Sequence, residues 1–109
     1  YNIARVCAST ERPDGAIDGL ICAGAEDGEY AYHGCLDDIF AEARELPRFE
    51  RVVILAERRV YREVDRLLKT GGRQAVLDYL VEYPYLQRII ETRSAFEKYR
   101  GMLPEAPPE

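Results

Sequence analysis

The side chains best suited to chemistry are three cysteines and the single histidine of the chain. If the first third of the chain forms adjacent strands, these residues can share one face of a sheet: Cys7, Cys22, His33 and Cys35. Three thiolates and an imidazole would suit a tetrahedral zinc ion. The spacing contains no CxxC or CxxH knuckle, so buried thiols that pack as small apolar groups, or a redox pair, also fit the pattern. We expect no bound metal and no cofactor.

Cys35 is the best candidate for a nucleophile. It precedes a helix expected over Leu36–Leu46, and a helix N-terminus lowers the pKa of a thiol. His33 lies two residues away and could act as a base, although a lone histidine near a strand end is more often a surface residue or a hydrogen-bonded rim residue. No motif pairs a nucleophile with a base or forms a phosphate-binding glycine loop. Enzymatic activity is left open, and a non-catalytic role is favoured.

A second group of side chains forms a basic stripe. Its members are spaced three, four, three and four residues apart, which places them on one face of a helix: Arg59, Arg62, Arg66, Lys69 and Arg73. Residues 58–73 carry a net charge of +4, whereas residues 1–57 carry −7 and residues 74–109 carry −2. The stripe can be a solvated helix face, a contact for an acidic protein surface such as residues 1–57 of a second copy, or a contact for nucleic-acid phosphates.

The chain also has eight tyrosines, and Tyr83 and Tyr85 flank Pro84 in its second half. Tyrosine is enriched at surfaces that bury one end of the ring and leave the hydroxyl in water. These two residues are therefore a candidate contact patch, and packing of the helices is the alternative.

These side chains must be positioned by the elements that the hydrophobic pattern predicts. Turn residues between short apolar runs predict an antiparallel meander over Tyr1–Ser9, Ala16–Ala23 and Glu29–His33. Leu36–Leu46 has helical spacing and ends at a proline, and the β-branched run Val52–Ala56 predicts a buried strand. Helical patterns fill the chain from residue 58 to residue 99, with Gly71-Gly72 as a helix stop. The predicted class is α+β, in the order β-β-β-α-β-α-α-α.

Three antiparallel strands, a helix, a buried strand and another helix resemble the opening order of ribonuclease H-like folds over about residues 1–70. Such nucleases hold two metal ions with carboxylates on the first strand, the first helix and the end of the fourth strand. Asp37, Asp38 and Glu42 match the helix, and Glu57 matches the fourth strand, but the first strand has no acid. The resemblance therefore implies a scaffold without catalysis.

Length and composition set the limits of the functional prediction. The chain has 109 residues, 47% of them hydrophobic, and a formal charge of −5. We expect one domain over residues 1–100, a proline-rich tail over 101–109, no membrane span and a cytoplasmic location. The predicted function is a small binding module that acts through a protein interface, as a homodimer or in a larger complex. The alternative is a nucleic-acid-associated protein that uses the basic stripe.

Overall fold

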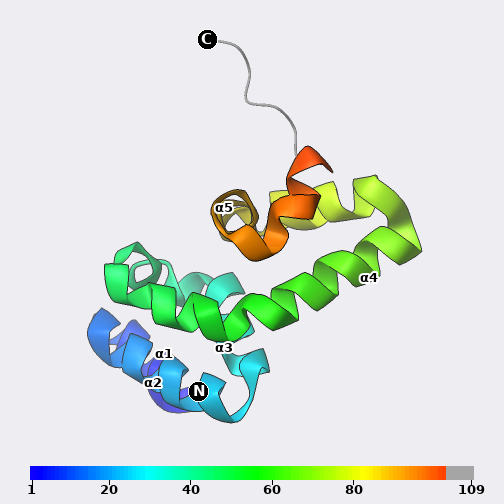
Figure 1. Cartoon of the computed structure of the whole chain (residues 1–109). Coiled ribbons are helices and arrows are strands. Elements are labelled where there is room, and N and C mark those ends of the chain that lie inside the picture. The colour runs from blue at the N-terminus through cyan, green and yellow to red at the C-terminus, as the bar shows by residue number, and fades with distance from the viewer. Residues whose placement is uncertain (103–109) are drawn as a thin grey trace. The chain divides into compact units, whose positions relative to one another are not determined.

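The computed structural model describes residues 1–102, and every regular element in that part of the chain is helical (Figure 1). The α-helices are α1 (Asn2–Ser9), α2 (Pro13–Glu26), α3 (Gly28–Leu36), α4 (Glu50–Glu82) and α5 (Pro84–Thr92). Between and after them lie the 3₁₀ helices η1 (Asp38–Phe40), η2 (Ala43–Glu45), η3 (Pro47–Phe49) and η4 (Ser94–Met102). Of the predicted proline-rich tail, residues 103–109 lie outside the described part of the chain.

The α+β prediction is wrong, because the three runs assigned to a meander form α1, α2 and α3. In α2 the buried residues are Ala16, Ile17, Leu20 and Gly24, which are spaced as one face of a helix. The run from Val52 to Ala56 likewise belongs to α4 and not to a buried strand. Short apolar runs fit either period, and packing against neighbouring helices decided the outcome here.

The residues expected to form turns instead begin helices. Pro13 occupies the first turn of α2, where its missing N–H costs no hydrogen bond. Asp27 caps α3, and its carboxylate accepts a hydrogen bond of 2.9 Å from the backbone N–H of Glu29. Proline and aspartate suit both turns and helix starts, which is why the pattern was ambiguous.

The helix predicted over Leu36–Leu46 is also wrong, because α3 ends at Leu36 and the chain continues in 3₁₀ turns. Asp37, with extended backbone, ends α3 and also caps η1. Arg44 then reaches back and donates from Nη1 to the carbonyl oxygens of Gly34 and Asp37 at 3.0 and 2.8 Å. The bond to Gly34 satisfies a carbonyl group that the end of a helix leaves without an intrahelical partner, and the Asp37 carbonyl also accepts from the backbone N–H of Phe40 at 3.1 Å.

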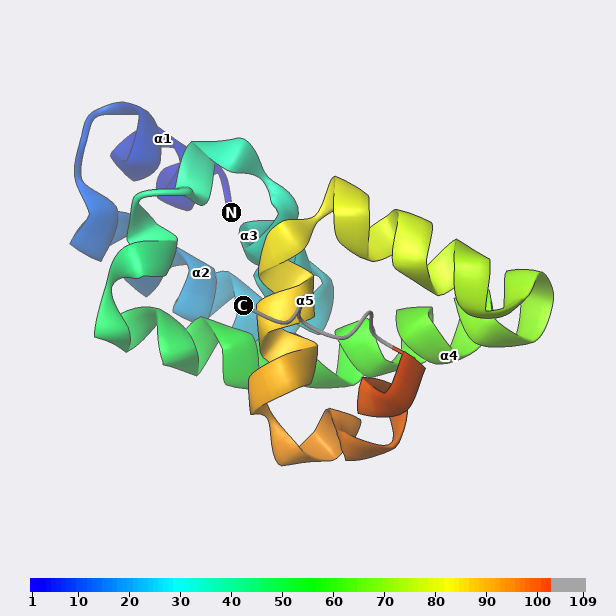
Figure 2. The same cartoon turned by 90° about the horizontal axis from the view of Figure 1, so that it is seen from above.

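The helical prediction for the second half is confirmed. The expected glycine stop is the break in α4 at Gly72, whose φ of 71° and ψ of −166° suit only glycine. The sharp bend in α4 is visible in Figures 1 and 2, where green passes into yellow. Pro84 stands at the start of α5. Eight of the predicted inner positions in these helices are buried: Val60, Val64, Val76, Leu80, Leu86, Ile89, Ile90 and Phe96. Four others are only half-buried: Leu67, Leu68, Ala75 and Tyr79.

The chain divides into two compact units, Tyr1–Arg62 and Glu63–Glu109, called unit 1 and unit 2 below. The single domain expected over residues 1–100 stays a prediction, and each unit is described by itself. In unit 2, Arg100 donates to the carbonyl oxygens of Ile90 and Arg93 at 3.1 and 2.8 Å and so closes the end of α5. These acceptors lie ten and seven residues back, the same spacings as for Arg44 in unit 1.

In unit 1, α1 packs on α2 through small residues. A Cβ atom added at Gly19 would lie 2.9 Å from Cα of Ala4, and one added at Gly15 would lie 2.9 Å from Sγ of Cys7. Glycine therefore lets the two helices approach more closely than any side chain would permit. Gly15 and Gly19 also line a hollow on the surface of unit 1.

Candidate functional site

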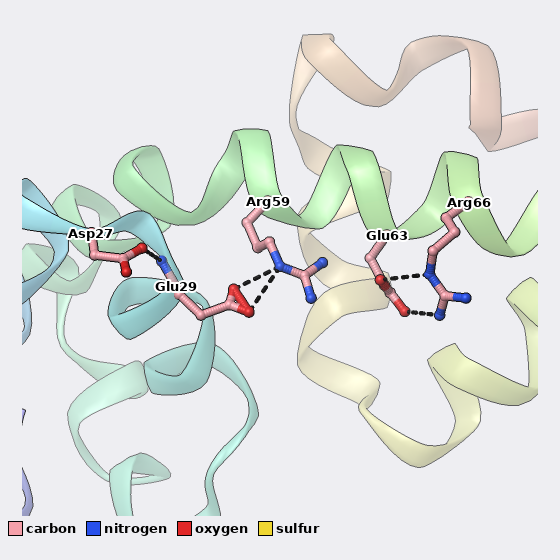
Figure 3. Close-up of polar contacts among 5 residues, drawn as sticks. All are labelled: Asp27, Glu29, Arg59, Glu63 and Arg66. Carbon is pink, nitrogen blue, oxygen red and sulfur yellow. Dashed lines mark hydrogen bonds and ion pairs between the residues drawn. The ribbon is translucent and has the colours of Figure 1, made fainter.

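Arg59, the first residue of the predicted basic stripe, lies in unit 1 and is engaged by α3. Its Nε donates to both carboxylate oxygens of Glu29 at 3.1 and 2.6 Å, and its guanidinium lies 4.4 Å from the centre of the Tyr32 ring. Figure 3 shows Glu29 directed at Arg59 while Asp27 holds the backbone N–H of Glu29. This arginine connects two helices of unit 1.

In unit 2, Arg66 and Lys69 also pair with acids of their own helix. Arg66 donates to Glu63 at 2.5 and 3.2 Å, as Figure 3 shows. Lys69 lies 2.8 Å from the carboxylate of Asp65. The hydrogen bond from Lys69 is the largest cause that lowers the pKa of Asp65, and the hydroxyl of Tyr99 at 3.2 Å contributes to the same shift.

The two remaining residues of the stripe have different surroundings. Arg62 is exposed and makes no hydrogen bond or ion pair with the described residues. Arg73 is exposed and follows the break at Gly72, so the helical spacing that joined it to Lys69 does not continue through α4. The five bases thus lie along α4, but three of them already neutralise carboxylates.

Cys35 lies at the end of α3 and not at the start of a helix, which overturns the reason for choosing it as a nucleophile. Its side chain is buried, and burial raises the pKa of the thiol to about 12, although the nearby Arg44 acts in the opposite direction. A thiol with that pKa is protonated at neutral pH, and the thiolate is the reactive form.

The other three members of the suggested zinc site do not complete a metal centre. Cys7 is half-buried on α1, Cys22 is exposed on α2, and His33 is exposed beside the rings of Tyr1 and Tyr32. Within residues 1–102 no group of three or more His, Cys, Asp or Glu side chains could hold a metal ion. Two of the thiols, those of Cys7 and Cys22, do line one hollow.

The carboxylates that matched a ribonuclease H-like scaffold have no sheet to hold them, so that resemblance is wrong. Asp37 caps η1 by accepting a hydrogen bond of 3.1 Å from the backbone N–H of Ile39. It also accepts a bond of 3.5 Å from the hydroxyl of Tyr1. Asp38 and Glu42 are exposed in the 3₁₀ segment.

The tyrosines of the suggested contact patch are half-buried in unit 2. Tyr83 packs edge-on against Tyr79 with ring centres 5.5 Å apart, and the negative charge of Glu82 is the largest cause that raises the pKa of Tyr83. The ring of Tyr85 lies 5.5 Å below the guanidinium of Arg88. Their part in a contact stays a prediction.

Unit 1 carries a feature that the sequence did not indicate, a surface hollow of about 590 Å³ between α1, α2 and the start of α3. We call it the unit 1 hollow. Its floor includes Gly15 and Gly19, where α1 and α2 approach closely, and its wall includes the half-buried Cys7. The spacing of four between the two glycines was a signal for close helix packing, but it has that meaning only once α2 is known to be a helix.

Large apolar side chains stand exposed around this hollow. Ile3 is 74% exposed and Tyr30 is 40% exposed, and both line it. Val6, one turn along α1 from Ile3, is 61% exposed. Val6 itself does not line the hollow, and the described residues contain only two further exposed large apolar side chains, Ile54 and Val81, which do not line it either.

Carboxylates supply the charge of the unit 1 hollow. Asp18 and Glu26 line it, and no lysine or arginine does. Arg48 lies 3.0 Å from Asp14 and 2.5 Å from Asp18, so it neutralises that part of α2. Glu26 is exposed and makes no hydrogen bond or ion pair within residues 1–102. The hollow is therefore an apolar surface with an unpaired negative charge at one end of α2.

Comparison with protein-family models, with curated proteins and with solved structures found no match for this chain. Among the described residues, no helix is both long and apolar enough to cross a membrane.

Proposed function

We propose that this chain is a non-catalytic interaction module that binds a partner protein through the unit 1 hollow. The observation that carries the proposal is that Ile3 and Tyr30, both exposed, line one concave surface, with the exposed Val6 one turn along α1 from Ile3. Single exposed apolar residues are common on proteins, whereas a contiguous patch beside a hollow is typical of a binding surface. Covering these side chains would remove apolar area from water, which is the main driving force of association.

The packing beneath the hollow supports the same proposal. Gly19 sits against the backbone of Ala4, and Ala16, Ile17 and Leu20 are buried beneath, so the floor is a firmly packed pair of helices. A pre-formed surface does not have to be ordered when the partner binds, and affinity is not lost to that cost.

The basic stripe supports the alternative, a nucleic-acid contact, less strongly. Arg59, Arg66 and Lys69 pair with Glu29, Glu63 and Asp65, and a phosphate would have to compete with these carboxylates. Salt-sensitive retention of the wild-type chain on DNA or RNA, abolished by Arg62→Glu, is the result that would favour this alternative over the protein interface.

The proposal is tested by capture of partners from native cells with three forms of the chain. A double variant, Ile3→Asp with Val6→Asp, places charge in the hollow at Ile3 and on the exposed face of α1 beside it, and Val81→Asp makes the same change at a residue 78% exposed in unit 2. We expect the same protein to be captured by the wild type and by Val81→Asp and to be lost with the double variant. Identical captures by all three folded forms would contradict the proposal.

A further inference from the structure

We infer that the occupant of the unit 1 hollow is an amphipathic helix of a partner protein that carries a lysine or arginine beside its apolar face. This inference rests on the proposed function and adds the chemistry of the partner. It depends on three features of the hollow: the charge that remains unpaired, an aromatic ring next to it, and the helical shape of the surface.

The first feature is the row of side chains along the outer face of α2. Asp18, Cys22 and Glu26 are four residues apart, so they lie one helical turn from each other, and all three are exposed. Arg48 neutralises Asp18 at 2.5 Å. Glu26 has no ion pair or hydrogen bond within the described residues, and no basic side chain lines the hollow. A basic group from outside the chain is the complement of this surface.

The second feature is the ring of Tyr30, which lines the hollow together with Glu26. This ring is 40% exposed and stacks on Tyr1, with ring centres 5.6 Å apart and an angle of 26° between the planes. A cation above an aromatic face is attracted by the electrons of the ring. Glu26 and Tyr30 thus favour the same kind of group, a lysine or arginine side chain.

The third feature is the shape of the surface. Unit 1 has no strand among its described residues, so it offers no sheet edge to which an extended peptide could add. It offers instead Ile3, which lines the hollow together with Gly15 and Gly19, and the exposed Val6 three residues further along α1. Side chains at that spacing form the ridges between which another helix packs.

The inference is tested with two synthetic amphipathic helical peptides that share one leucine face. The Lys peptide carries lysines beside that face, and the Glu peptide carries glutamates at the same positions. Each is labelled with a fluorophore and titrated with the full chain at low salt while the anisotropy is measured. We expect the Lys peptide to bind roughly tenfold more tightly than the Glu peptide, with a difference that shrinks at high salt.

Two variants test whether the difference in affinity between the two peptides arises at the hollow. Glu26→Gln removes the unpaired charge and should reduce the difference between the peptides severalfold, whereas Glu42→Gln removes an exposed charge that does not line the hollow and should leave it unchanged. Ile3→Asp should abolish binding of the Lys peptide. Circular dichroism of each variant confirms that it is folded.

The outcomes separate this inference from the proposed function. Equal binding of the two peptides, or no binding of either, overturns the inference, while partner capture sensitive to Ile3→Asp would leave the proposed function standing. Sedimentation provides a further outcome: a dimer that dissociates in Ile3→Asp and excludes the Lys peptide would show that a second copy occupies the hollow. That result would also overturn the inference.

Discussion

Arg59 of α4 and Glu29 of α3 form a two-fold hydrogen-bonded ion pair, with the Nε of Arg59 2.6 and 3.1 Å from the two carboxylate oxygens. The guanidinium also lies over the ring of Tyr32. A residue that the spacing assigned to a binding stripe therefore holds two helices of unit 1 together. We expect Arg59→Gln to lower the free energy of unfolding by about 1–2 kcal/mol, because it loses a charged hydrogen bond and a cation–π contact.

The matched control for this variant is Arg62→Gln. Arg62 belongs to the same helix and is exposed without a partner among the described residues, so its replacement should change the stability by less than about 0.5 kcal/mol. Urea unfolding followed by circular dichroism measures both. Equal losses in the two variants would show that the Glu29 contact contributes nothing.

A second prediction concerns the glycines between α1 and α2. In Gly19→Ala the new Cβ would lie 2.9 Å from Cα of Ala4, which is backbone and cannot move alone. We expect a loss of about 1–3 kcal/mol, despite the better helix propensity of alanine. In Gly15→Ala the nearest atom is Sγ of Cys7, a side-chain atom that can rotate away, so the loss measured by urea unfolding should be smaller. The reverse order would contradict the close packing of α1 on α2.

A third prediction concerns the break in α4. Gly72 has a φ of 71° and a ψ of −166°, a backbone conformation that a side chain makes costly. Gly72→Ala should therefore destabilise the chain by about 1–3 kcal/mol, whereas Gly101→Ala, where nothing lies within 4 Å of the added Cβ, should be close to neutral. Thermal unfolding of the two variants checks this, and a neutral Gly72→Ala would mean that α4 can continue without the bend.

A fourth prediction follows from the burial of Cys35, which raises the pKa of its thiol from 9.0 to about 12. In the folded state this thiol stays protonated up to about pH 12, whereas in the unfolded chain it loses its proton above about pH 9. The contribution of the thiol to the free energy of unfolding is therefore fully present below pH 9 and is lost as the pH rises toward 12. The free energy of unfolding of the wild type should fall more steeply between neutral pH and about pH 11 than that of Cys35→Ala. Parallel profiles would contradict the burial of the ionisable group.

The second half of the chain could be predicted because its apolar residues follow one period over long segments. Val60 and Val64 precede the glycine stop, and Val76 and Leu80 follow it, all buried. Such spacing fits a helix and no other element. The pair Gly71-Gly72 also predicted where the helix stops, because glycine alone readily adopts the backbone angles found at Gly72.

The first third could not be predicted in the same way because its runs are short and rich in small residues. Ile17, Leu20 and Gly24 are spaced as a helix face, but the same run also reads as an apolar strand between two turn signals. The choice depends on the contact of Gly19 with Ala4, which lies far along the chain and is invisible to local patterns.

The candidate site could not be predicted from the sequence for the same reason. Cys7 and Cys22 were expected to share a face, and they do line one hollow, but they do so from two helices and without His33 or Cys35. In the sequence, Ile3 and Tyr30 are single apolar residues that do not by themselves indicate a surface feature. They line one hollow only when α1, α2 and α3 are placed together.

The central claim, that the unit 1 hollow is the contact surface, is tested most directly by site-specific photo-crosslinking in native cells. A photoreactive amino acid replaces Ile3, which lines the hollow, or the exposed Val6 one turn along α1, and replaces Glu42, an exposed polar residue of the same unit, as the control. We predict one discrete protein adduct from positions 3 and 6 and none from position 42. Absence of an adduct at positions 3 and 6, or the same adduct at all three positions, would contradict the account.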